Sequence, residues 1–526
     1  MNKNEKNKVK ERGRFLEKGK RGALNILFGK SSIIVILILI QVFYFFWAFT
    51  RLQNYISVVV SASVVAIAIS LIYLGSTTSS PEVKLSWMII VFVVPIVGAV
   101  IYMWVHLDLG YYLESKRLKS IDETTKKYNF DDSALTARLD GENEYYGATK
   151  YLKNTGGFSA YENTSVKYYP SGETYFEALI EEIEKAEKFI FLEFFIIDDG
   201  YMWDRILDIL KKKASEGVDV RLMYDGMCAL YRFPYGYPKE LQKFGIKCRM
   251  FAPIHPIIST SYNNRDHRKI LVVDGKVAFT GGVNLADEYI NVKQRFGKWK
   301  DAAVSVRGDA VYGFTLMFLK MWNVYEENCE YERFLNVEHK ECQAEGYVVP
   351  YGDSPLDHER MGENVYLDII NRAKKYVYIM SPYLILDGIM TNALTLASKR
   401  GVDVRIILPH IPDKKYAFAL AKSHYFELIG AGVRIYEYAP GFIHSKVFLS
   451  DDSNAVVGTI NLDYRSLYLH FECALYMKDV PAISDIYDDF KTTFYECIEV
   501  TEESIKNEKF TTKLAGKLLK WIAPLM

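Results

Sequence analysis

The sequence predicts an α/β protein with membrane-spanning helices at its N-terminus, followed by two pseudo-symmetric halves with mixed, largely parallel sheets. Three observations predict this fold. Three uncharged apolar runs lie within the first 105 residues, the order of expected helices and strands occurs twice after residue 168, and one polar motif also occurs twice. At 526 residues the chain is too long for one domain, and its hydrophobic content of 50% is high for a soluble enzyme.

The N-terminal region predicts a basic tail followed by membrane helices. Residues 1–30 carry ten Lys or Arg against three acidic residues, which indicates a cytoplasmic tail that attracts anionic lipid. Residues 31–107 contain three apolar runs, 33–49, 56–74 and 87–105, of 17 to 19 residues. As helices these runs would be about 25–29 Å long, enough to span a bilayer, with buried core helices as the alternative.

The number of spans and the orientation stay open. A cytoplasmic tail and three spans would place the rest of the chain outside, whereas five Lys and Arg residues within 116–127 indicate cytoplasm. Two spans, with a re-entrant or surface-lying segment, would remove this conflict. We therefore expect a multi-pass membrane protein with two or three spans.

After a linker or juxtamembrane region at 108–165, the chain predicts two similar halves, 166–336 and 337–500. In each half, apolar residues at helical spacing precede a strand-like run, and a second helix leads to Gly-Val-Asp-Val-Arg, at 217–221 and at 401–405. A glycine before a β-branched run ends a helix and begins a strand, so each half contains the strand, helix, strand unit of a largely parallel sheet. Two copies of this size suggest halves related by a pseudo-twofold axis.

A polar motif occurs once in each half. The copies read His267-x-Lys269-x4-Asp274-x6-Gly281-x2-Asn284 and His444-x-Lys446-x4-Asp451-x6-Gly458-x2-Asn461. On an extended strand the His and the Lys, two residues apart, project from the same face. Displacing an alcohol from a phosphodiester needs a nucleophile at phosphorus and a proton for the departing oxygen, so two imidazoles suit this chemistry. A single copy would more often be a solvated strand face.

The other motif residues have separate expected roles. The lysines and asparagines offer donors to phosphate oxygens, so that negative charge is held without a metal. No metal-ligand spacing such as CxxC or HExxH occurs. Asp274 precedes Gly275 between two apolar runs, a hairpin pattern, and Asp451 has the same place in the second copy. We expect both aspartates to brace a strand and not to touch the substrate.

These residues resemble the phospholipase D superfamily, whose HKD motif is HxKx4Dx6G[GS]xN, and within it the bacterial cardiolipin synthases. Flanking residues that share the resemblance are Asn264-Arg265, Asp287-Glu288-Tyr289, Trp299-x-Asp301, Gly441-Phe442, Asp463-x-Arg465-Ser466 and Phe471-Glu472. His470 departs from the family, which usually has Asn before Phe-Glu. The resemblance implies two phospholipase D-like α/β/α halves whose motifs meet at one interface, with no cofactor.

The resemblance also implies roles for individual residues. A covalent phosphatidyl-histidine would form on His267, while His444 would protonate the leaving glycerol and then activate the incoming hydroxyl. The sequence itself does not distinguish the two copies. Asp301 and Glu472 match carboxylates that steady each histidine from the opposite half and so fix its tautomer. Ordinary surface charge is the alternative for either carboxylate.

Charge and the C-terminal composition limit the partners. With 65 basic and 65 acidic residues the net charge is zero, so no broad nucleic-acid footprint is present. Residues 501–526 predict an amphipathic helix, either lying in a bilayer interface or docked on the enzyme.

Six cysteines without paired spacing indicate neither a disulfide framework nor a metal site.

The sequence therefore predicts phosphodiester transfer on lipid. By resemblance, we expect a bacterial membrane enzyme that binds phosphatidylglycerol and anionic membrane lipids, and that converts two phosphatidylglycerols into cardiolipin and glycerol. A phospholipase D that uses water as the acceptor is the main alternative, and a non-catalytic protein that binds anionic lipid is another. The range of donor and acceptor lipids and the oligomeric state stay open.

Overall fold

The computed structural model describes residues 39, 43, 56–77, 80–106, 112–141, 147–253, 264–326, 329–339, 344–357 and 359–525. The chain divides into two compact units. The N-terminal unit comprises residues 1–113, 254–262 and 525, and the α/β unit comprises residues 114–253, 263–524 and 526.

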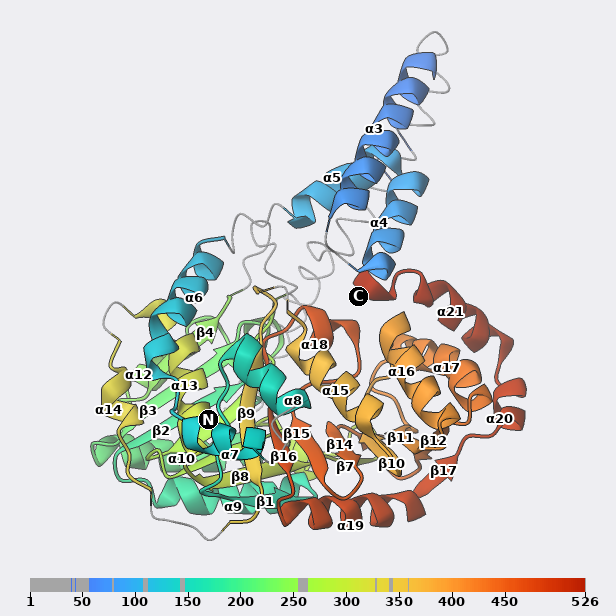
Figure 1. Cartoon of the computed structure of the whole chain (residues 1–526). Coiled ribbons are helices and arrows are strands. Elements are labelled where there is room, and N and C mark those ends of the chain that lie inside the picture. Colours follow the sequence, from blue (N-terminus) through green and yellow to red (C-terminus); the bar gives the residue numbers. More distant parts are fainter. Residues whose placement is uncertain are drawn as a thin grey trace, which may run out of the picture. The chain divides into compact units, whose positions relative to one another are not determined.

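The N-terminal unit contains the helices α3 (Ile56–Ser76), α4 (Pro81–Val93) and α5 (Pro95–His106), drawn in blue in Figure 1. The second apolar run forms α3. The third run is divided at Pro95, which has no backbone N–H and disfavours helical geometry at the preceding Val94 (φ −134°, ψ 73°). The prediction of one continuous helix over 87–105 is therefore wrong.

The predicted membrane spans gain no support from these helices. None of the helices that the structure describes combines the length and the apolarity needed to cross a bilayer. Apart from Leu39 and Phe43, the first apolar run and the basic tail lie outside the described residues.

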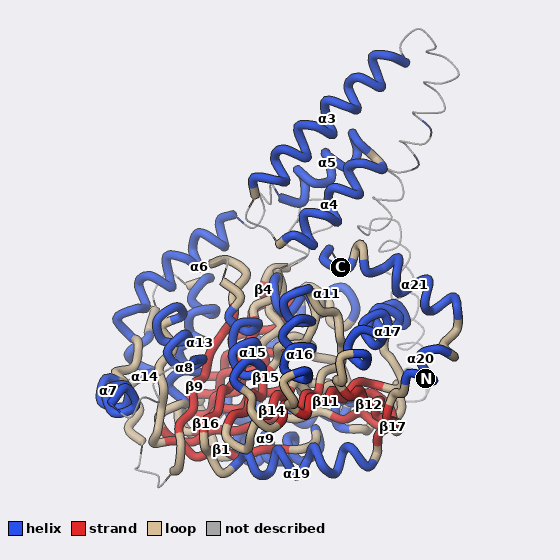
Figure 2. The backbone as a smooth tube through the Cα atoms, turned by 45° about the vertical axis from the view of Figure 1, so that its right-hand side comes forward, coloured by secondary structure: helices blue, strands red, loops and turns tan. Residues whose placement is uncertain are grey.

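Two mixed sheets form the centre of the α/β unit (Figures 1 and 2). The strand order is β1-β8-β6-β5-β2-β3-β4 in the first sheet and β9-β16-β15-β14-β10-β11-β12-β17 in the second. Apart from β17 the two orders match strand for strand, which confirms the predicted duplication. The strands of the first sheet are β1 (Thr164–Tyr169), β2 (Phe189–Phe194), β3 (Asp219–Asp225), β4 (Lys247–Phe251), β5 (Lys269–Val273), β6 (Val277–Gly281) and β8 (Ala303–Gly308). Those of the second are β9 (Tyr347–Asp353), β10 (Tyr376–Met380), β11 (Asp403–Pro409), β12 (Arg434–Tyr438), β14 (Val447–Ser450), β15 (Asn454–Gly458), β16 (Glu472–Lys478) and β17 (Cys497–Glu499).

Most neighbouring strands run antiparallel, so the prediction of largely parallel sheets is wrong. Within these two sheets, the parallel pairs are β2–β3, β3–β4, β10–β11 and β11–β12. The strand, helix, strand units produce these pairs, as predicted. The remaining pairs are antiparallel because the motifs lie on the hairpins β5–β6 and β14–β15, and β8 and β16 extend each hairpin in the same manner.

Both hairpins turn at the aspartates that the sequence singled out. In the first, Asp274 and Gly275 have φ angles of 54° and 67°, and in the second, Asp451 and Asp452 have φ angles of 54° and 60°. Backbone in this left-handed region is tolerated by Gly, Asn and Asp better than by other residues. The predicted hairpin at Asp274 is confirmed.

Helices cover both faces of each sheet, which gives the α/β/α layers visible in Figure 2. On the first sheet, α9 (Gly172–Glu184) contacts β1 and β8, while α13 (Val311–Trp322) contacts β5, β6 and β8. On the second sheet, α15 (Met361–Arg372) contacts β9 and β14, while α19 (Ala482–Tyr495) contacts β12, β14 and β17. A separate hydrophobic core lies within each half.

The other helices complete these layers and connect the strands. Part of the predicted linker is built into the second core, where Leu135, Leu139 and Leu152 are buried. The remaining helices are α6 (Tyr112–Thr125), η2 (Lys126–Tyr128), α7 (Ser133–Gly141), α8 (Gly147–Tyr151), η3 (Leu152–Gly156), α10 (Tyr201–Ser215), α11 (Cys228–Tyr231), α12 (Tyr237–Gln242), η4 (Asp287–Ile290), η5 (Asn323–Tyr325), α14 (Tyr331–Leu335), α16 (Gly388–Lys399), α17 (Lys415–Gly430), α18 (Tyr464–Tyr468), α20 (Glu502–Lys506), α21 (Phe510–Lys520) and η6 (Ala523–Leu525).

Candidate functional site

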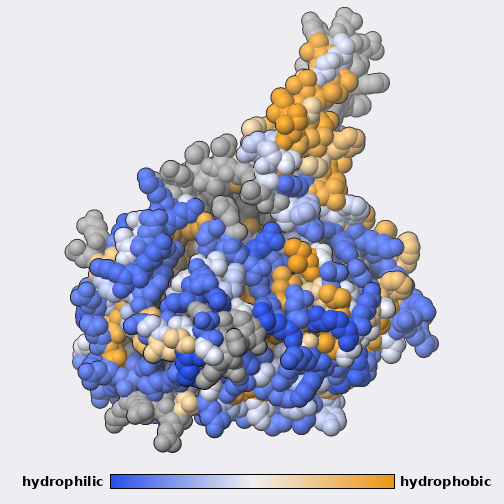
Figure 3. Space-filling view, viewed as in Figure 1, coloured by the Kyte–Doolittle hydropathy of each residue, from blue (hydrophilic) through white to orange (hydrophobic). Residues whose placement is uncertain are grey.

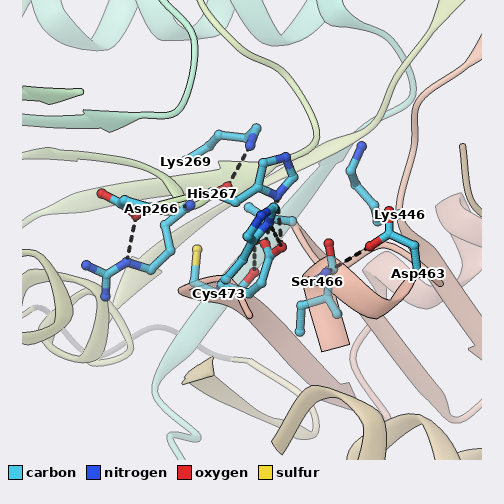
Figure 4. Close-up of polar contacts among 12 residues, drawn as sticks. Asp266, His267, Lys269, Lys446, Asp463, Ser466 and Cys473 are labelled. Carbon is cyan, nitrogen blue, oxygen red and sulfur yellow. Dashed lines mark hydrogen bonds and ion pairs between the residues drawn. The ribbon is translucent and has the colours of Figure 1, made fainter. Parts of the chain in front are cut away.

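The two halves meet where their motifs lie. Strands β6 and β8 of the first sheet contact β15 of the second, and β6 also contacts β16. A small two-stranded sheet joins the halves as well, with β7 (Lys298–Lys300) parallel to β13 (Gly441–Ile443). Each motif histidine is bonded through its backbone to the opposite half: His267 N donates to Phe471 O at 2.9 Å, and His444 N donates to Lys300 O at 2.7 Å. Figure 4 labels residues of both halves at this interface.

Each histidine is paired with a carboxylate from the other half. Nδ1 of His267 lies 2.9 Å from both oxygens of Glu472, and Nδ1 of His444 lies 2.7 Å from Oδ2 of Asp301. Both imidazoles and both carboxylates are buried. When Nδ1–H donates to a carboxylate, Nε2 keeps its lone pair and the ring is held in one orientation. The structure therefore brings His267, His444, Asp301 and Glu472 together, as the family resemblance implied.

Burial sets the charge state of these pairs. It lowers the pKa of His267 to about 3 and the pKa of His444 to about 4, although the facing carboxylates act in the opposite direction. Burial alone would raise the pKa values of Glu472 and Asp301, but their pairing with His267 and His444 lowers these values below the ordinary range. At neutral pH the site thus holds two neutral imidazoles and two carboxylates.

The two lysines supply positive charge at the same place. Lys269 Nζ donates to the backbone carbonyl of His267 at 2.6 Å, and Lys446 Nζ lies 2.9 Å from Nδ1 of His444. Burial lowers the pKa of Lys269 to about 8 and that of Lys446 to about 7. Each lysine also interacts electrostatically with both carboxylates, Glu472 and Asp301. The two motifs therefore share one electrostatic site.

The two motif asparagines are not equivalent in the structure. Asn284 accepts from Ile196 N at 2.9 Å through Oδ1, and its Nδ2 donates to the Tyr289 hydroxyl at 2.7 Å. The Tyr289 ring in turn lies 5.3 Å from the His444 ring. Asn461 is buried, and its Oδ1 has no hydrogen-bond partner among the described residues. Phosphate contacts from either asparagine remain a prediction.

Sequence reasoning missed a difference between the copies that the structure explains. Gly282 and Thr459 hold corresponding places, 177 residues apart. A Cβ at Gly282 would lie 2.0 Å from Asp301 Oδ1, so glycine is required for the carboxylate to approach His444. At Thr459 the hydroxyl instead donates to Glu472 Oε2. The signal was present in the aligned motifs, as a glycine in one copy and a hydroxyl in the other.

The motif aspartates lie away from the histidines and bind backbone. Asp274 accepts from the amides of Glu187, Lys188 and Phe189 at 2.7–2.8 Å. Asp451 accepts from the amides of Lys374, Lys375 and Tyr376 at 2.7–2.9 Å. In each half the aspartate thus ties its hairpin to the start of the neighbouring strand, which agrees with the bracing role expected for it.

Replacing Asp274 with alanine should lower the free energy of unfolding by about 3 kcal/mol, because three backbone donors lose a charged acceptor and alanine is strained at positive φ. Urea unfolding of the detergent-solubilised protein would measure this loss. Asp208→Ala, on the exposed face of α10, is the control and should change stability by less than about 0.5 kcal/mol. Equal stability of the two variants would contradict the bracing role.

His470 adds a third imidazole to the site. Its ring lies 5.5 Å from the His267 ring, and its Nδ1 lies 3.7 Å from Glu472 Oε1. Neither ring nitrogen has a hydrogen-bond partner in the described part of the chain. One donor atom from each of His267, His470 and Glu472 could hold a metal ion, since these atoms lie within 4.8 Å of one another. A cation bound there would occupy the imidazole that is expected to attack phosphorus.

Comparisons with known proteins agree with this geometry. The chain matches the family described as "Cardiolipin synthase, PLD-like domain" over residues 179–295 and 366–494, and the family described as "Phospholipase_D-nuclease N-terminal" over residues 62–105. It is 50% identical over 458 residues to an uncharacterized protein of Streptococcus mutans, which covers 87% of this chain and 99% of that protein.

Relatives with a stated activity are also similar over most of their length. The chain is 30% identical over 489 residues to a cardiolipin synthase of Alkalihalophilus pseudofirmus, with 90% of this chain and 94% of the relative covered. It is 32% identical over 457 residues to a cardiolipin synthase of Clostridium perfringens, with 85% and 95% covered. The crystal structure of phosphatidylserine synthase from Haemophilus influenzae Rd KW20 has the same fold, with a TM-score of 0.53 at 16% identity over 72% of this chain and 97% of that one.

Proposed function

Because the chain belongs to the cardiolipin synthases of the phospholipase D superfamily, and is thus a phospholipid phosphatidyltransferase, we propose that it converts two phosphatidylglycerols into cardiolipin and glycerol. We further propose a covalent phosphatidyl-histidine on His267. The observation that carries this proposal is the crossed pairing of each histidine with a carboxylate of the other half.

In the first proposed step, Nε2 of His267 attacks the phosphorus of one phosphatidylglycerol. A P–N bond forms, the P–O bond to the headgroup glycerol breaks, and His444 gives its proton to that oxygen. In the second step, a headgroup hydroxyl of the other phosphatidylglycerol gives its proton to His444 while its oxygen attacks phosphorus. The P–N bond breaks, so both histidines return to their first state.

The charges of the site support this sequence of steps. A neutral His267 has the lone pair that the attack needs, and the two lysines face the phosphate oxygens on which negative charge accumulates. The anionic phosphodiester raises the pKa of His444 when it binds, because opposite charges favour the protonated imidazole. In this scheme Asp274 and Asp451 touch no substrate atom.

We also propose that the N-terminal unit attaches the enzyme to a bacterial membrane. Helix α3 exposes large apolar side chains, among them Val64, Ile69 and Ile72, and Figure 3 shows hydrophobic residues over these N-terminal helices in orange. Exposed apolar surface of this extent marks a contact with lipid or protein. The multi-pass arrangement of residues 31–107 and the boundaries of the halves at 166–336 and 337–500 remain predictions.

Vesicles of phosphatidylglycerol given to the purified full chain should yield cardiolipin and free glycerol in equal amounts, measured by mass spectrometry. The reaction should continue in the presence of a divalent-ion chelator, because the proposed steps use imidazoles and lysines alone. Phosphatidic acid without cardiolipin would instead identify a hydrolase, and the absence of any product would identify a lipid-binding protein without activity. Loss of turnover with the chelator would show that a metal is needed.

The pH dependence of kcat/KM on a short-chain phosphatidylglycerol should be bell-shaped. On the acidic side the rate falls as pH drops toward the pKa of His267, about 3, where the nucleophile gains a proton. As pH rises above the pKa of His444, about 4, kcat/KM falls because the free enzyme loses its acid. It falls more steeply in an alkaline limb through the pKa values of Lys446 and Lys269, about 7 and 8, where the cations lose their charge.

The variant Lys446→Arg tests the alkaline limb, since a guanidinium stays charged over this range. It should move that limb to higher pH by about one unit or more. Lys446→Met should lower the rate at every pH. An alkaline limb that is unchanged in both variants would exclude the lysines as its origin.

A further inference from the structure

A cavity of about 720 Å³ lies in the second half, outside the two motifs. It is lined by α17, by the segment from β17 to α20, and by the C-terminal helix α21. None of its lining residues belongs to an HKD motif or to the carboxylates that face them. This volume falls in the range of pockets that bind small molecules.

The C-terminal helix forms one wall of the cavity because it is docked on α17. A Cβ at Gly516 would lie 2.4 Å from the backbone oxygen of Ala419, so the two helices approach closely at a glycine. An ion pair between Lys422 and Glu508 fastens the turn that precedes α21. Of the two arrangements left open by the sequence, the structure shows the docked helix.

The walls of the cavity are apolar and reach the surface. Phe426 of α17 is 69% exposed, and Phe510 and Leu514 of α21 are 76% and 46% exposed. Leu518 and Trp521 continue this apolar stripe along the helix, and Figure 3 shows orange residues on the edge where α21 lies in Figure 1. Large aromatic and aliphatic side chains at the mouth of a pocket indicate that it binds an apolar group.

The polar groups of the cavity favour an anion, because its carboxylates are already paired. Glu437, Glu499 and Glu508 line the cavity, and they pair with His410, Arg434 and Lys422. Residues 509–526 contain no acidic residue, and α21 places Lys513 and Lys517 at the cavity. On the opposite wall Nδ1 of His410 lies 2.8 Å from Glu437, which also accepts from the Tyr425 hydroxyl at 3.3 Å. A lysine-rich rim beside an apolar wall matches an amphiphile with a negatively charged head.

We propose that this cavity binds one anionic phospholipid of the bilayer. Its acyl chain lies against Phe426, Phe510 and Leu514, and its phosphate binds Lys513 and Lys517. The site holds the α/β unit to the anionic membrane independently of the chemistry at the histidines, so it does not rest on the proposed reaction. It gives a physical reason for an amphipathic helix that is docked on the protein and still exposes apolar side chains.

Photolabelling of the full chain tests this site. The probe is a phosphatidylglycerol with a diazirine in one acyl chain, added to the enzyme in a neutral detergent, with phosphatidylcholine of the same chains as comparison. Mass spectrometry of the digested protein should place label on residues 422–426 and 510–518, with about tenfold less label from phosphatidylcholine. Label at the motif peptides is counted separately, so occupancy of the catalytic site does not confuse the result.

Variants of the two lysines distinguish the loss of a charged contact with the lipid from a loss of folding. Lys513→Glu/Lys517→Glu should reduce the label in these segments at least about fivefold, and the milder Lys513→Gln/Lys517→Gln should reduce it less. The matched control Lys211→Glu/Lys212→Glu, on α10, should leave it unchanged. The proposal would be overturned if the two lipids labelled the protein equally or if these segments carried no label. It would also be overturned if unlabelled free oleate reduced the labelling as strongly as unlabelled phosphatidylglycerol.

Discussion

Replacing His267 with alanine should abolish both turnover and the lipid-bound form of the enzyme, whereas replacing His444 should abolish turnover and spare the adduct. Without His267 the site loses its proposed nucleophile, so we expect a fall in kcat of about 10⁴-fold or more. His444 acts on the leaving and incoming oxygens. A phosphatidyl ester of nitrophenol needs no acid to release its leaving group, so His444→Ala should still form the adduct and then hold it.

Intact-mass measurement after a brief reaction gives the outcome directly. In His444→Ala the protein should gain the mass of one phosphatidyl group, and fragmentation should place this group on His267. In His267→Ala the protein mass should not change. His339→Ala, outside the site, is the matched control and should turn over normally. An adduct located on His444 would reverse the two roles.

The two histidines, which the sequence does not distinguish, have different surroundings in the structure. Lys446 Nζ lies 2.9 Å from Nδ1 of His444, so that imidazole contacts both an ammonium and the carboxylate of Asp301. Each lysine donates to the backbone carbonyl of the histidine two residues before it, but among the described residues Lys269 makes no contact with the His267 ring. Burial, and then this ammonium, lower the pKa of His444, so its imidazolium, once formed on substrate binding, gives up its proton readily, which supports the acid role proposed for it.

Local patterns in the sequence were sufficient to predict the hairpins and the repeated strand, helix, strand units. An Asp-Gly pair between apolar runs is encoded within a few residues, and Asp274 turns the chain there with positive φ. The same holds for the strand, helix, strand units, which appear as the parallel pairs β2–β3 and β10–β11. These features depend on contacts between residues close in the chain.

Several features that depend on distant contacts were not predicted, and the crossed pairing of histidines and carboxylates was expected through the family resemblance alone. The antiparallel majority of each sheet follows from how hairpins add to a central strand, and no single segment encodes that choice. The break at Pro95 follows from proline's missing backbone N–H, whereas the apolar composition of the run, taken alone, predicts one continuous helix. The requirement for glycine at Gly282 became apparent once Asp301, from another strand end, was placed beside it.

Replacing Glu472 with glutamine, or Asp301 with asparagine, should lower kcat by about 10²–10⁴-fold while the protein stays folded. An amide can donate to Nδ1, which then accepts a hydrogen bond and leaves the proton on Nε2. In Glu472→Gln the nitrogen that faces phosphorus would thus lose the lone pair needed for attack. The two variants should slow different steps, because each carboxylate serves a different histidine.

The nitrophenyl substrate distinguishes these steps. Glu472→Gln should slow formation of the adduct, whereas Asp301→Asn should form it at nearly the normal rate and transfer the lipid slowly. Adding Glu472→Gln to His267→Ala should cost nothing further, since the carboxylate acts through that imidazole. Glu363→Gln, which alters a buried carboxylate of α15 away from the site, is the matched control.

If Glu472→Gln and Glu363→Gln lost activity equally, the loss would reflect damage to the fold and not to the site. If Glu472→Gln kept full activity, the 2.9 Å contact would have no part in the reaction. The expected pattern, a large effect of Glu472→Gln that vanishes without His267, requires that the carboxylate of one half orients the imidazole of the other. Such a dependence would mean that neither half is competent alone, which is the chemical reason for a duplicated chain to keep both copies.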